Sequence, residues 1–114
     1  MPHRNLEMNY TPPTVVAFKS GAISSTAIGL TDLGFTAEEI AEAERAIIST
    51  HATEVHMRWD GGNPTGTTGI MLDEGSGAAF AVIVGSENLQ NLKFIKESGG
   101  ADGTLSVMLE KQNT

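Results

Sequence analysis

The sequence predicts a mainly β fold, a single antiparallel β-sandwich or jelly-roll-like domain with one short helix. Three observations predict it. Short apolar runs recur along the chain, clusters of Gly, Asp, Asn and Ser separate them at spacings of about 8–12 residues, and no strand–helix–strand rhythm appears. The 114 residues suit one domain rather than two, and the 13 glycines favour many turns.

An N-terminal arm is expected to precede the domain. Residues 1–13 are polar and end in Pro12-Pro13, whereas the alternating apolar pattern fills residues 14–111. Such a segment is either a disordered tail or an arm that orders on a neighbouring subunit. In the second case, the side chains expected to make the contact are Arg4, Leu6, Met8 and Tyr10.

The first half of the domain is expected to hold three strands and the helix. β-Branched residues favour extended structure in the two segments before residue 31. Thr36 followed by Glu39 matches a capping box, and the helix formers after it predict about two helical turns. The expected elements are a strand at Thr14–Lys19 closed by Ser20-Gly21, an extended segment at Ala22–Leu30, a helix at Ala37–Glu44 and a strand at Arg45–Thr50.

A β-hairpin is predicted in the middle of the chain. The segment Glu54–Trp59 alternates between polar and apolar residues, which is typical of a half-buried strand. The cluster Asp60–Pro64 has turn chemistry, because Gly tolerates a positive φ and Pro pre-sets a turn φ. We expect this cluster to project as a tip between two strands, the second of which is Ile70–Leu72.

Three further strands are expected to complete the domain. Ala78–Val84 is apolar on both sides, which favours a strand covered on both faces. A turn at Gly85–Asn88 then leads into Leu89–Lys96, where the adjacent residues Phe94 and Ile95 break the alternation and suggest a bulge. The last strand is Leu105–Glu110, and the predicted core consists of Val55, Met57, Trp59, Phe80, Val82, Leu92, Phe94, Leu105, Val107 and Leu109.

Composition and charge restrict the function classes. The net charge of −7 argues against nucleic acid as a partner, because phosphate binding needs clustered Lys and Arg. The sequence contains no Cys, which excludes disulfides, a thiol nucleophile and Cys-ligated zinc. The longest apolar run, Ala78–Val84, is too short to cross a bilayer, and the N-terminus lacks the apolar region of a secretory signal.

No motif in the sequence demands catalysis, a cofactor or a metal. His51 and His56 lack the spacing of a zinc site and are expected to be surface imidazoles. The loop Gly62–Thr68 resembles a phosphate-binding loop but lacks its Lys and connects two strands. The helix is expected to expose a solvated acidic face formed by Glu38, Glu39, Glu42 and Glu44. Asp73 and Glu74 are expected to lie in a turn that lacks the ligand spacing of a calcium-binding loop. No serine lies in the G-x-S-x-G motif of a hydrolase nucleophile.

Several short motifs follow one another along the chain, and they are Ser25–Thr31, His56–Thr65, Gly69–Gly75, Asn91–Lys96 and Ala101–Val107. Their order resembles that of a group of small virion proteins of tailed bacteriophages. The resemblance covers residues 22–110, and the acidic segment Phe35–Glu44 lies outside the shared pattern. It implies a structural, non-enzymatic β-sandwich and does not distinguish head from neck, tail or fibre.

The resemblance leads to a first functional hypothesis, a capsid decoration or cement protein. Such a protein binds major capsid protein on the outer shell of a virion assembled in the host cytoplasm, here as a homo-oligomer with a trimer favoured. One alternative is a head–tail adaptor, baseplate or fibre-base protein, and another is a carbohydrate-binding module. Besides the arm, the expected contact residues are those of the hairpin tip, Gly61, Gly62, Asn63, Pro64 and Thr65.

Overall fold

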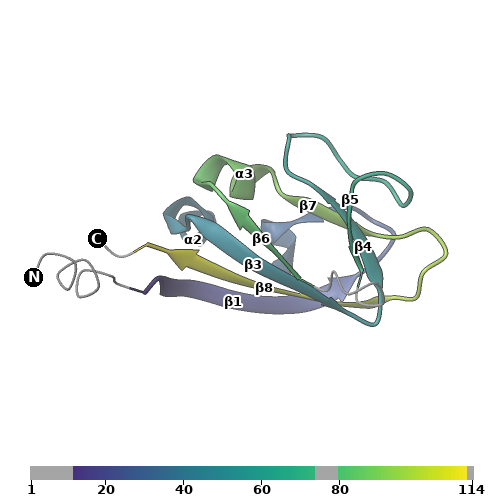
Figure 1. The fold of residues 1–114 in the computed structure, drawn as a ribbon, viewed down its shortest axis with the longest axis horizontal. Helices are drawn as coiled ribbons and strands as arrows, with labels where there is room; N and C mark the ends of the chain where they lie inside the picture. Colours follow the sequence, from purple (N-terminus) through teal and green to yellow (C-terminus); the bar gives the residue numbers. More distant parts are fainter. Residues whose placement is uncertain (1–11, 74–79, 113–114) are drawn as a thin grey trace, which may run out of the picture.

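A computed structural model describes residues 12–73 and 80–112, and it shows two antiparallel four-stranded sheets (Figure 1). The prediction of a mainly β, sandwich-like fold is therefore confirmed. The first sheet has the strand order β1 (Thr14–Ile23), β8 (Gly103–Lys111), β3 (Arg45–His51) and β6 (Phe80–Val84). The second sheet has the order β2 (Ile28–Gly29), β7 (Lys93–Lys96), β4 (Glu54–Arg58) and β5 (Ile70–Asp73).

The core lies between the inner faces of the two sheets. Apolar side chains on one side of each strand are removed from water together, which is the main favourable contribution to folding. Most of the predicted core residues are fully buried, whereas Trp59 is half-buried and packs against the edge of the core. The confirmed core residues are Val55, Met57, Leu92, Phe94, Leu105, Val107 and Leu109.

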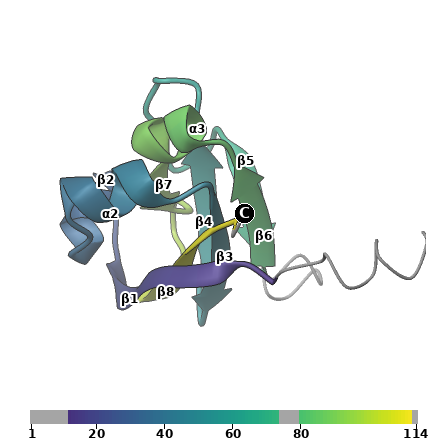
Figure 2. The ribbon, with the colours of Figure 1, turned by 90° about the vertical axis from the view of Figure 1, so that its left-hand side faces the viewer.

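Two short helices cover one side of the sandwich (Figure 2). The predicted helix is confirmed as α2 (Ala37–Glu42), and its capping box is formed: Glu39 N donates to Thr36 Oγ1 at 3.1 Å, and Thr36 N donates to Glu39 Oε1 at 2.9 Å. The helix contacts α3 (Ser86–Asn91) and buries Ile40. A 3₁₀ turn, η1 (Leu30–Leu33), precedes it.

The first strand is longer than predicted, and the turn expected at Ser20-Gly21 is wrong. The strand β1 continues to Ile23 because β8 pairs with it along that length, with Ser20 opposite Ser106 and Gly21 opposite Leu105. A Cβ at Gly21 would lie 2.9 Å from the Leu33 side chain, so glycine here permits close packing rather than a turn. Of the extended segment expected at Ala22–Leu30, Ala22 and Ile23 belong to β1, and Ile28 and Gly29 form β2.

The turn and strand start predicted around residue 89 are also wrong, because this region forms the helix α3. Leu89 points into the core and is buried, which stabilises a helical turn over a short polar segment. The expected bulge at Phe94 and Ile95 does not occur, since β7 keeps an unbroken register with β4. The register shift lies instead in β1, between Val15 and Ala17.

The strand β6 was expected to be covered on both faces, and this prediction is wrong. It lies at the edge of the first sheet, and only Ile83 on its inner face is buried. Phe80 and Val84 are each 64% exposed and Val82 is 48% exposed, so two predicted core residues lie on the surface. Alternation alone could not reveal this, because an apolar outer face has the same pattern whether or not another layer covers it.

Candidate contact surfaces

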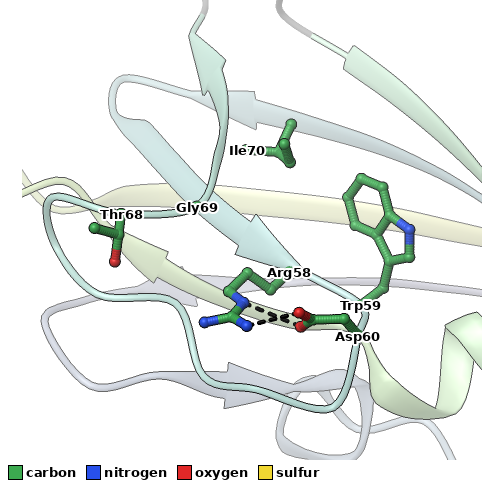
Figure 3. A pocket seen from close by; sticks show the side chains of 6 residues that line it. All are labelled: Arg58, Trp59, Asp60, Thr68, Gly69 and Ile70. Carbon is green, nitrogen blue, oxygen red and sulfur yellow. Dashed lines mark hydrogen bonds and ion pairs between the residues drawn. The ribbon is translucent and has the colours of Figure 1, made fainter.

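The predicted hairpin loop is held together by an ion pair at its base (Figure 3). Arg58 donates to Asp60 twice, from Nε at 3.0 Å and from Nη2 at 2.6 Å, and Gly62 N donates to the same carboxylate at 3.1 Å. These hydrogen bonds, the arginine's first, lower the pKa of Asp60 to about 2. A Cβ at Gly62 would lie 2.6 Å from Arg58 Nη2, so glycine makes room for the guanidinium.

The loop does not project freely, which corrects the expectation of a protruding tip. Ser98 N donates to Gly66 O at 2.8 Å, and Lys93 Nζ donates to Asn63 Oδ1 at 3.4 Å. These contacts hold the loop against β7 and the segment that follows it. Of the tip residues predicted to contact a partner, Gly61, Asn63 and Thr65 are exposed, Gly62 is half-buried and Pro64 is buried. Arg4, Leu6, Met8 and Tyr10 lie outside the described residues.

A groove of about 340 Å³ lies where β4 ends and β5 begins. Trp59 and Ile70 lie on the same side of the Arg58–Asp60 pair, and Thr68 and Gly69 complete the wall (Figure 3). The indole of Trp59 packs against the core, which agrees with its predicted structural role. The groove therefore presents one partly covered aromatic ring rather than a fully exposed aromatic platform.

A second groove, of about 490 Å³, carries three carboxylates from neighbouring elements. Glu54 on β4 lies opposite Asp73 on β5, and Glu97 follows β7. The side-chain hydrogen bond between Glu54 and Glu97, together with partial burial and the charges of Asp73 and Glu97, raises the pKa of Glu54. The groove is thus a place where negative charges repel one another.

His56 is buried, so the prediction that it is a surface imidazole is wrong, whereas His51 is exposed as predicted. Met71 and Ile95 flank His56 on the neighbouring strands, and a Cβ at Gly69 would lie 3.1 Å from its Cβ. Neither ring nitrogen makes a hydrogen bond among the described residues. The Glu97 carboxylate lies close to the ring, with 3.6 Å between its Oε1 and His56 Nε2.

Replacing Glu54 with glutamine is expected to stabilise the protein at pH 7. A carboxyl group whose pKa is raised above its ordinary 4.5 in the native state destabilises that state once the pH exceeds 4.5. The amide keeps a hydrogen bond to Glu97 and removes the repulsion. We expect the melting temperature of Glu54→Gln to exceed that of the wild type by about 1–3 °C at pH 7, with the difference disappearing near pH 4.

A matched control for this prediction is Glu87→Gln on α3, which removes the same charge from an exposed site in the first turn of a helix. An acidic residue there interacts favourably with the helix dipole, so this variant is expected to gain no stability. Thermal unfolding followed by circular dichroism measures both effects. An equal stabilisation of both variants would attribute the change to net charge and not to the carboxylate groove.

The outer face of the first sheet presents a continuous apolar surface. Strand register places four apolar side chains in one row across all four strands, with Phe80 and Val84 beside this row on β6. We call these six residues the apolar face; they are Phe18, Met108, Ile47, Val82, Phe80 and Val84. Phe18 is 58% exposed, and the three residues of β6 are also exposed.

The apolar face carries almost no charge, although the chain as a whole is acidic. The ion pair of Arg45 and Glu110 lies beside it, with a distance of 2.7 Å between Arg45 Nε and Glu110 Oε1, and is neutral overall. The next row consists of the hydroxyl side chains Ser20, Ser106 and Ser49. Sequence analysis missed this face, because the alternation of Phe80, Val82 and Val84 does not distinguish an inner face of a sheet from an outer one.

Comparisons of this chain with protein-family models, with curated proteins and with solved structures find no match. Within residues 12–73 and 80–112, no group of three His, Asp or Glu side chains is arranged to hold a metal ion. In the same ranges, no helix is both long and apolar enough to span a bilayer. Surface geometry is therefore the basis on which a function is proposed.

Proposed function

We propose that this chain is a structural virion protein of a tailed phage that binds the outer surface of the assembled shell as a decoration protein. The single observation that carries the proposal is the apolar face of the first sheet. Exposed apolar patches rimmed by polar residues mark interaction sites, because leaving them in water is costly. The choice of partner rests on the motif order described above, which resembles that of small phage virion proteins.

The chemistry of the apolar face suits attachment to a large protein surface. Its four strands present a broad, shallow face, and the neighbouring serines and the neutral Arg45–Glu110 pair supply a polar rim. The remaining acidic residues oppose non-specific association of the free protein through the rest of its surface. Binding the assembled shell more tightly than its free subunits would stabilise the shell by mass action.

The test is binding of the purified protein to shells isolated from particles that carry this chain. Phe18→Ala is expected to weaken binding at least about fivefold, since truncated interface aromatics are frequent hot spots. Ile70→Ala is the matched control, because Ile70 is 56% exposed but belongs to the second sheet. Equal binding by both variants and the wild type would refute the apolar face as the docking surface.

Counting copies per particle by quantitative mass spectrometry separates the decoration role from its alternative. A shell protein is expected in hundreds of copies, whereas a head–tail adaptor, baseplate or fibre-base protein is expected in about six or twelve. A low count would retain the virion and overturn the shell position. The hairpin tip and the arm remain predicted secondary contacts.

A further inference from the structure

The strand β6 is an edge strand of the first sheet. In the described part of the chain it pairs with β3 on one side and with no strand on the other. Its sequence, Phe80–Val84, contains no charge and no proline, and its register with β3 has no bulge. Proteins commonly use charged residues, prolines or bulges to prevent an edge strand from pairing with another chain. The opposite edge strand, β1, has both a bulge after Val15 and the charged residue Lys19.

Alternation of the backbone hydrogen bonds identifies the groups at this open edge. Gly85 N donates to Glu44 O at 2.8 Å, which is the bond expected beside a non-hydrogen-bonded pair of Arg45 and Val84 in the antiparallel ladder. The residues two and four positions before Gly85, which are Ile83 and Ala81, also direct their backbone N–H and C=O groups toward β3. The backbone groups of the intervening residues therefore point to the open side, and these residues are Phe80, Val82 and Val84. Asn88 Nδ2 donates to Val84 O at 2.9 Å, which agrees with a carbonyl that β3 does not use.

We propose that β6 pairs antiparallel with β6 of a second copy of this chain, about a two-fold axis at Val82. The three residues with open-side groups are symmetric about Val82, so this register pairs all of them, and Val84 O accepts a second hydrogen bond beside the one from Asn88 Nδ2. Val82 lies opposite Val82 of the second copy, and Phe80 lies opposite Val84 of the second copy. The result is an isologous dimer, in which the same strand forms both halves of the interface.

A second copy is the occupant that the strand fits best. The net charge of −7 opposes association through most of the surface, but β6 itself is uncharged. Pairing places Val82 beside Val82, and Phe80 beside Val84, on the outer face and removes part of their area from water. The apolar faces of the two copies then form one face on an eight-stranded sheet. This inference does not require that the proposed shell partner be correct.

The absence of cysteine from the sequence allows a direct test by cross-linking. In the proposed register, the two Val82 Cα atoms are about 5.5 Å apart, within the range that a disulfide spans. Under mild oxidation with diamide, Val82→Cys is expected to form a disulfide dimer at least about tenfold faster than a surface thiol that relies on collision. Val15→Cys supplies that comparison, because Val15 is 51% exposed in the same sheet.

Sedimentation velocity of the unmodified protein and of Val82→Lys supplies the second measurement. The wild type is expected to sediment with twice the monomer mass of 12.0 kDa, and Val82→Lys as a folded monomer with an unchanged circular dichroism spectrum. Phe18→Ala, the variant for shell binding, is expected to remain a dimer. Failure of shell binding therefore leaves this result intact, and the two proposals can be judged separately.

Three results would overturn the proposal. The first is a wild type that remains monomeric at about 100 μM, and the second is equal cross-linking rates for Val82→Cys and Val15→Cys. The third is a dimer that appears only after deletion of residues 2–11, which would show that the arm and not a second copy occupies the edge of β6.

Discussion

Phe94→Ala is expected to lower the free energy of unfolding by about 3–5 kcal/mol, because it removes a ring from the centre of the core. Phe94 is completely buried on β7, and its register neighbours are Ile28 on β2 and Met57 on β4. Domains of this size are typically stable by only about 5–15 kcal/mol. The variant should therefore unfold at least about 12 °C below the wild type in a thermal scan.

Phe18→Ala is the matched control, since it makes the same chemical change at a largely exposed position on the outer face of the first sheet. Surface substitutions of this kind usually change stability by less than about 1 kcal/mol. Both variants should be compared by urea unfolding with a common slope, so that a change in midpoint reports stability alone. A large loss for Phe18→Ala with little loss for Phe94→Ala would mean that the two sheets pack through the opposite faces.

Local chemistry predicted the elements whose signals agree with one another. The capping box of Thr36 and Glu39 and the helix formers after it predicted α2 in nearly the observed position. The alternation around Met57 and the turn cluster after Trp59 predicted the hairpin of β4 and β5. In these segments, intrinsic propensity and tertiary packing favour the same structure, which is the condition for a reliable reading of sequence.

Tertiary packing determined the structure of the segments that sequence analysis assigned wrongly. Leu89 stabilises a helical turn only because a core exists for it to enter, and Ser20-Gly21 stays extended because β8 is long enough to pair with it. His56 is buried although polar residues at such positions usually face solvent. In each case the neighbouring segment is distant in the chain, so a local pattern could not specify it.

The candidate contact surface was the least predictable part of the molecule. Alternation placed Phe80 and Val82 on one side of a strand, which is correct, but it could not tell an inner face from an outer one. The structure distinguishes the two faces, because β6 lies at the edge of its sheet in the described part of the chain and Ile83 is the buried residue on its inner side. The apolar face thus arises from register across four strands, and no single segment encodes it.

Arg45→Ala is expected to lower the free energy of unfolding by about 1.5–3 kcal/mol, because it leaves a shielded carboxylate without its charged partner. The Glu110 side chain is only 12% exposed, and that of Arg45 is 34% exposed. Lys111→Ala breaks an ion pair with Glu42 of similar length, 2.6 Å, in which both side chains are more exposed. That control should cost less than about 1 kcal/mol, as surface pairs usually do.

The double variant Arg45→Leu with Glu110→Leu distinguishes the cost of an unpaired charge from the value of the pair itself. Replacing both partners with apolar side chains leaves no carboxylate without a partner, and such replacements are often neutral or stabilising. We therefore expect chemical denaturation to show the double variant closer in stability to the wild type than to Arg45→Ala. If the double variant is as unstable as Arg45→Ala, the pair contributes net stability of its own, and the explanation by an unpaired buried charge is wrong. The two mutations also add leucines beside the apolar face, so tighter self-association of the double variant is the accompanying result expected from sedimentation.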